Sequence, residues 1–166
     1  MMTNLASLSS DLFVLFDNIA DDLRSSGFSV RPNALPNDLC LNLRQTLLSL
    51  DKSAFKQAGV GRDVRNQTNA DLRRDEIVWI EPGEGPKNEW LEFSSRLQQH
   101  LNRKLMLGLF TFESHFAHYA PGAFYKTHLD AFRGQANRIL SVVLYLNPDW
   151  ADDEGGEMVL YQETEP

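Results

Sequence analysis

The sequence predicts a single α+β domain with a helical first half and a strand-rich second half. Up to about residue 105, apolar side chains recur three and four residues apart, which is the period of an amphipathic helix. From Phe110 onward they occur in short runs separated by turn residues, which is typical of antiparallel strands. Helices followed by a run of strands indicate the α+β class, in which the helices brace one face of a barrel or sandwich.

Three helices are expected in the first half, and their apolar stripes are predicted to face the core. They cover residues 11–26, 36–50 and 86–105. Ser9 or Ser10 is available to cap the first helix, and Gly27 is expected to end it. Pro36 and Pro86 open the other two, because proline is favoured in the first turn of a helix.

The expected strands are short. They cover residues 28–30, 77–80, 110–119, 124–130, 138–146 and 157–161. Turn signals separate the later ones at Pro121-Gly122, Asn147-Pro148 and Gly155-Gly156. The segment from Gly59 to Asp75 is polar, rich in arginine and without an apolar period, so it is expected to be a mobile loop.

Composition excludes several classes of protein. Of 166 residues, 42% are hydrophobic and 23% charged, which is typical of a globular domain rather than a disordered chain. A net charge of −7 argues against nucleic-acid binding, which needs a basic surface. The apolar stretch 12–16 is too short and too closely flanked by aspartates for a signal peptide or a membrane span. Cys40 is the only cysteine, so we expect no internal disulfide and a cytoplasmic protein.

A His-x-Asp pair, His128 and Asp130, is the leading candidate for a chemical site. In a strand, side chains two residues apart point to the same face, so the imidazole and the carboxylate would lie side by side. They are two thirds of the 2-His-1-carboxylate set that binds non-haem Fe(II). No histidine follows His128 in these residues. The pair therefore predicts a metal site that lacks one ligand.

The other three histidines are expected to have structural roles, and several motifs of other active sites are absent from the sequence. His100 is expected at the boundary or surface of the third helix. His115 and His118 would face opposite sides of one strand, so structural roles are expected for both. The sequence has no Gly-x-Ser-x-Gly turn, no zinc-finger spacing and no phosphate-binding glycine loop.

Several ordered motifs accompany the His-x-Asp pair. They are Arg74-Asp-Glu-Ile-Val-Trp-Ile80, Tyr119-Ala-Pro-Gly122, Tyr125-Lys-Thr-His-Leu-Asp130, Leu144-Tyr-Leu-Asn147, Asp149-Trp150 and Gly155-Gly156. From about residue 27 to 161 the chain resembles the Fe(II)- and 2-oxoglutarate-dependent prolyl hydroxylases, in the branch of the animal oxygen-sensing enzymes and their bacterial counterparts. The resemblance implies a double-stranded β-helix, or jelly roll, within a single domain over residues 1–166. Helical support would cover about 1–108, and the β-helix core about 109–166, with its last strands missing.

The resemblance also implies roles for individual residues. His128 and Asp130 would bind Fe(II), and Tyr145 would direct its hydroxyl toward the distal carboxylate of 2-oxoglutarate. Tyr119 would line the same pocket, and Tyr125 would act near the metal and the substrate. The alternative for the three tyrosines is that they are ordinary amphipathic side chains on a half-buried sheet. The polar loop 59–75 would be a lid that selects the substrate.

The implied activity is hydroxylation of a prolyl residue in a protein, with 2-oxoglutarate and O2 as cosubstrates and succinate and CO2 as co-products. Ascorbate is an optional addition, and a bacterial translation factor is a candidate substrate. Neither a nucleic-acid nor a membrane partner is expected.

The family's second histidine, and its arginine or lysine for 2-oxoglutarate, come from strands beyond the Gly-Gly turn. Both are missing here, which leaves three alternatives. The favoured one is a fragment of a longer enzyme, and the second is a truncated peptide-binding form with impaired catalysis. The third is a cupin-like metal protein of other chemistry, against which the strand bearing Tyr145 argues.

Overall fold

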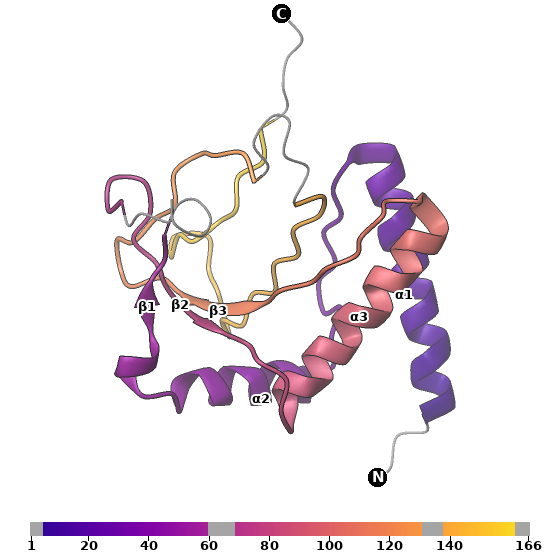
Figure 1. Cartoon of the computed structure of the whole chain (residues 1–166), viewed down its shortest axis with the longest axis horizontal. Coiled ribbons are helices and arrows are strands. Elements are labelled where there is room, and N and C mark those ends of the chain that lie inside the picture. Colours follow the sequence, from indigo (N-terminus) through magenta and orange to yellow (C-terminus); the bar gives the residue numbers. More distant parts are fainter. Residues whose placement is uncertain (1–4, 60–68, 131–137, 162–166) are drawn as a thin grey trace, which may run out of the picture.

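A computed structural model describes residues 5–59, 69–130 and 138–161, and Figure 1 shows their arrangement. In chain order the elements are α1 (Leu5–Ser26), α2 (Asn37–Leu48), the 3-10 helix η1 (Lys52–Ala54), β1 (Lys56–Gln57), β2 (Glu76–Trp79), α3 (Pro86–Leu105) and β3 (His115–His118). Helix α3 packs against both α1 and α2, and the strands lie beside the C-terminal half of α2 (Figure 1). None of the helices among these residues is long and apolar enough to cross a membrane.

The three predicted helices are confirmed, with one error at the start of α1. This helix begins at Leu5, so Ser9 and Ser10 lie inside it and neither is the expected cap. Leu5 and Leu8 continue the helical spacing of the later apolar residues, which explains the earlier start. Gly27 ends α1 as predicted, with a φ of +78° that favours glycine, and its N–H donates to the Leu23 carbonyl at 3.1 Å.

The sheet has three antiparallel strands in the order β1-β2-β3. Strand β2 confirms the prediction for residues 77–80, and β3 confirms part of the strand expected over 110–119. The strands expected over 28–30, 124–130, 138–146 and 157–161 are not formed in the described residues. A strand is stable only where a neighbour pairs with it, and within the described residues these segments form no ladder beyond a single antiparallel bridge between Arg73 and Tyr125. A jelly roll therefore stays a prediction, with which this mixed helix and sheet arrangement is consistent.

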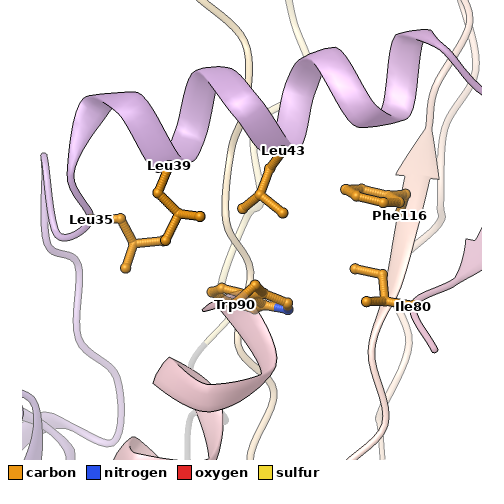
Figure 2. Packing of buried hydrophobic residues seen from close by; sticks show 6 residues of the cluster. All are labelled: Leu35, Leu39, Leu43, Ile80, Trp90 and Phe116. Atoms are coloured by element: carbon orange, nitrogen blue, oxygen red, sulfur yellow. The ribbon is translucent and has the colours of Figure 1, made fainter. Parts of the chain in front are cut away.

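Two apolar clusters hold the elements together, and α3 contributes to both. The first joins α2, α3 and the strands, as Figure 2 shows, through Leu35, Leu39, Leu43, Ile80, Trp90 and Phe116. The second joins α1 to α3 through Phe16, Ala20, Leu97 and Leu101. Trp90 also donates its indole N–H to the Ser114 hydroxyl at 2.9 Å, which ties α3 to the start of β3.

His100 is buried rather than at the surface, which corrects the expectation for this residue. Only 5% of it is exposed, and its Nε2 lies 2.9 Å from Oδ1 of Asp17 on α1. Lys104 places its Nζ 2.8 Å from the same oxygen. Hydrogen bonds from Lys104 and then His100 hold the pKa of Asp17 below its usual range. A polar contact between α1 and α3 thus lies beside the second apolar cluster.

We predict that Leu43→Ala lowers the free energy of unfolding by about 2–5 kcal/mol, because it opens a cavity in the first cluster. Leu43 is 1% exposed, whereas Leu41 on the same helix is 49% exposed. Leu41→Ala is the matched control and should change the free energy of unfolding by no more than about 0.5 kcal/mol. Urea unfolding followed by circular dichroism measures both, and equal losses in the two variants would contradict this account of the core.

We also predict that Asp17→Asn lowers the urea midpoint at neutral pH. A carboxyl whose folded pKa is depressed contributes stability above its unfolded pKa of about 3.9 and loses that contribution as the pH falls through the folded pKa. The difference between wild type and Asp17→Asn should therefore shrink in a titration from neutral pH to about 3. Asp21→Asn, which removes a surface pair with Arg24, is the control. A difference that does not depend on pH would reject the ion-pair explanation.

Candidate functional site

The candidate site forms where the chain before β2 meets the chain after β3. Arg74 N–H donates to the Phe124 carbonyl at 2.9 Å, and Lys126 N–H donates to the Leu72 carbonyl at 2.9 Å. Between these bonds, Arg73 and Tyr125 form an antiparallel bridge. The pairing fixes the position of residues 124–126 and hence of the His-x-Asp pair that follows.

His128 and Asp130 lie together, as the sequence predicts, although their segment is not a strand. His128 Nδ1 lies 2.7 Å from the Lys126 carbonyl oxygen. Because a carbonyl only accepts, Nδ1 carries a proton, and in the neutral form of the ring it is Nε2 that has the lone pair. Nε2 is 3.2 Å from Oδ1 of Asp130. Adjacent ligands of an octahedral ion, each at about 2.1 Å, stand about 3 Å apart, so this pair fits a divalent cation.

Asp130 is held as an anion by its neighbours. The Ser141 hydroxyl donates to Oδ2, and Arg138 Nη1 lies 3.1 Å from Oδ1. Partial burial acts to raise the pKa of Asp130, but the Ser141 hydrogen bond, followed by the charge of Arg138, outweighs it, and the pKa lies below its usual range. A carboxylate ionised at neutral pH is a suitable ligand for a hard metal ion. The sequence analysis did not identify Arg138 and Ser141 as neighbours of the site.

An arginine, a tyrosine and the histidine form consecutive contacts beside the pair. The rings of Tyr125 and His128 are stacked, with 3.6 Å between centroids and 15° between planes. Arg73 places its Cζ 4.3 Å from the centroid of the Tyr125 ring. Its guanidinium also binds both oxygens of Asp75, with 2.7 Å from Nε to Oδ1 and 2.5 Å from Nη2 to Oδ2.

These contacts correct the prediction of a mobile loop from Gly59 to Asp75. Asp75 has no exposed surface and its backbone carbonyl accepts from Ala58 N–H at 3.0 Å, so the end of this segment is fixed. Residues 60–68 lie outside the described part of the chain, and their expected role as a lid stays a prediction. Arg73 and Asp75 were missed as site residues.

Tyr119 interacts electrostatically with Asp75 and Arg73 of this cluster and with the two other tyrosines singled out in the sequence, Tyr125 and Tyr145. Burial, followed by the charge of Asp75, raises the pKa of Tyr119, and the phenols of Tyr125 and Tyr145 act in the same direction. The Tyr145 hydroxyl donates to the Gly156 carbonyl at 3.0 Å. Their roles toward 2-oxoglutarate stay predictions.

The remaining histidines have other partners. His115 meets the Trp79 ring edge-on at 5.1 Å, and His118 Nδ1 lies 3.8 Å from Oε2 of Glu76. No group of three or more histidine, cysteine, aspartate or glutamate side chains that could hold a metal ion exists within the described residues. The pair of ligands therefore has no third member there.

Comparisons with known proteins find similarity to one superfamily of oxygenases. Residues 114–166, which include the His-x-Asp pair, match the family model of the 2OG-Fe(II) oxygenase superfamily. A solved structure, the crystal structure of a Pseudomonas putida prolyl-4-hydroxylase, is similar to this chain with a TM-score of 0.64 and 35% sequence identity. The similarity covers 70% of this chain and 62% of that chain, so the chain spans less than two thirds of the hydroxylase it matches. A search of curated proteins finds no significant match.

The family-model match and the structural similarity both support a prolyl-hydroxylase-like member of the 2OG-Fe(II) oxygenase superfamily.

We predict that Ser141→Ala raises the pKa of Asp130 toward its ordinary value of about 3.9, because it removes a hydrogen bond to the ionised form. The stability linked to Asp130 is present above the unfolded pKa and is lost as the pH falls through the folded pKa. In the variant, the stability linked to Asp130 should therefore begin to fall at a higher pH when the solution is acidified. Carboxyl carbon NMR of Asp130 during a pH titration measures the shift. Ser95→Ala, which alters a hydroxyl bonded to Gln99 on α3, is the control, and an unchanged pKa in Ser141→Ala would contradict the prediction.

Proposed function

We propose that this chain provides the metal- and cosubstrate-binding region of an oxygenase that hydroxylates a prolyl residue in a protein. The observation that carries the proposal is the geometry of the His-x-Asp pair. Nε2 of His128 lies 3.2 Å from Oδ1 of Asp130, and in the neutral form of the ring a cation that contacts both atoms would satisfy both acceptors.

His128 and Asp130 would supply two ligands to Fe(II). When bound, Fe(II) with 2-oxoglutarate and O2 supplies the oxidation that converts a C–H bond to C–OH, with succinate and CO2 as co-products. The protein's own groups prepare the ligands for this metal. The Lys126 carbonyl selects the tautomer of His128, while Arg138 and Ser141 keep Asp130 ionised.

Tyr119 and Tyr145 are the phenols that we assign to the 2-oxoglutarate pocket, and Tyr125 we assign to the side of the metal and substrate. Burial and the nearby Asp75 carboxylate favour the protonated form of Tyr119, so its hydroxyl is available as a hydrogen-bond donor. The assignment of a prolyl substrate rests on the similarity to a Pseudomonas putida enzyme described as a prolyl-4-hydroxylase. A translation factor as substrate and a cytoplasmic location belong to the same proposal.

One observation favours a second candidate function. Only two metal ligands meet in the described residues, and a two-ligand site binds a metal ion more weakly than a complete triad. A peptide-binding form of the same fold with impaired turnover would fit this arrangement.

The two candidates differ in a direct measurement. Fe(II) and then 2-oxoglutarate are added to the chain without oxygen, and the visible charge-transfer band of the chelate is recorded. We expect a band that disappears in His128→Ala and persists in the control His118→Ala, because His118 lies on β3 beside Glu76 instead. Oxygen is then admitted and succinate is measured with a proline-containing peptide.

The three results lead to different conclusions. A band with succinate formation supports the hydroxylase, and a band without succinate supports the peptide-binding form. A chain that gives no band, or a band that survives His128→Ala, rejects the proposed metal site.

A further inference from the structure

We propose that Arg73 is a positioning residue for the metal ligand His128, acting through the ring of Tyr125. The buried carboxylate of Asp75 fixes the guanidinium of Arg73, the guanidinium holds the Tyr125 ring, and that ring sets the plane of the imidazole. The inference rests on the proposed function, because it assumes that His128 binds a metal ion.

The anchor of this arrangement is Asp75. Its side chain is fully buried, and a buried carboxylate is stable only when it is paired and hydrogen-bonded. Arg73, whose side chain is 13% exposed, supplies both hydrogen bonds in a bidentate geometry that only a planar guanidinium provides. Burial acts against the charge of Arg73, but Asp75 outweighs it and raises the pKa of the guanidinium above its usual range.

All three guanidinium nitrogens of Arg73 are already engaged within the protein. Nε and Nη2 bind Asp75, and Nη1 donates to the Gly59 carbonyl at 3.2 Å. The orientation of the guanidinium plane is therefore fixed from three directions.

Two ring contacts connect the fixed guanidinium of Arg73 to the imidazole of His128. Arg73 lies over the Tyr125 ring at 4.3 Å, a cation–π geometry, and the Tyr125 ring stacks on His128 at 3.6 Å. The hydrogen bond from His128 Nδ1 to the Lys126 carbonyl fixes one atom of the imidazole but leaves its plane free to tilt about that bond. Stacking on Tyr125 removes this freedom. Both contacts together aim Nε2 at the position beside Asp130.

Two neighbouring arginines allow a matched test. Arg73→Lys keeps the positive charge but loses the planar, bidentate pair with Asp75. Arg74 stands next to it, is exposed, and lies over the Phe124 ring at 4.8 Å, so Arg74→Lys makes the same chemical change outside the proposed chain of contacts. Circular dichroism and urea unfolding establish whether each variant is folded.

Two readouts are taken on the full chain. The first is the NMR shift of the His128 ring protons without metal, which the stacked Tyr125 ring displaces from its ordinary value. The second is the Kd for Mn(II), measured from the EPR signal of the free ion. In Arg73→Lys we expect the ring shift to return toward the ordinary value and the Kd for Mn(II) to rise about 10–100-fold. Arg74→Lys should change neither.

A second pair of variants keeps the inference testable if Arg73→Lys does not fold. Tyr125→Leu should reproduce both changes, and Tyr125→Phe, which restores a ring that can stack, should recover the His128 shift and the Kd for Mn(II). A folded Arg73→Lys with unchanged ring shifts and an unchanged Kd would overturn the inference, as would a Tyr125→Leu variant without effect. A wild-type chain that binds no Mn(II) would instead count against the proposed function, while the ring shifts still decide whether Arg73 positions His128.

Discussion

The packing of α3 against its neighbours is the contact on which the rest of the structure depends. Its first half buries Trp90 against α2 and the strands, and its second half buries Leu97 and Leu101 against α1. Ile80, at the end of β2, and Phe116, within β3, both pack in the Trp90 cluster. The helix therefore positions the two strands that lead into the candidate site, because Arg73–Asp75 precede β2 and the His-x-Asp segment follows β3.

The site contains two arginine–carboxylate pairs, and burial distinguishes their roles. Asp75 is fully buried and both of its oxygens are bound by Arg73, so it is committed to structure. Asp130 is 39% exposed and shares its oxygens with Arg138 and the Ser141 hydroxyl, which leaves it accessible and anionic. Because desolvating an ion costs several kcal/mol, a carboxylate that must bind a metal is better placed near the surface. The exposed member is accordingly the one to which we assign chemistry.

Sequence reasoning succeeded where the signal was local. The helices follow from apolar spacing within one segment. His128 and Asp130 lie together as expected, although the strand geometry from which their proximity was predicted is not formed. The same spacing joins Arg73 to Asp75 directly before a strand, and opposite charges at that interval are a signal that could have identified the pair. Contacts between residues distant in the chain were not predictable from the sequence. Asp17, for example, is 83 residues from its partner His100. The strands expected after residue 120 likewise depend on pairing partners that no local pattern specifies.

The segment that supports Asp130 also carries the apolar alternation that predicted a strand. Arg138 and Ser141 bind the carboxylate, while Val142 and Val143 beside them are about half exposed and have no ladder partner among the described residues. Unpaired backbone and exposed β-branched side chains favour pairing with another strand. A strand that paired with this segment next to Arg138 and Ser141 would lie near Asp130, because both residues contact that carboxylate. Such pairing would bury the valines beside the two residues that keep Asp130 ionised, so burial of this edge and the environment of the carboxylate would be coupled.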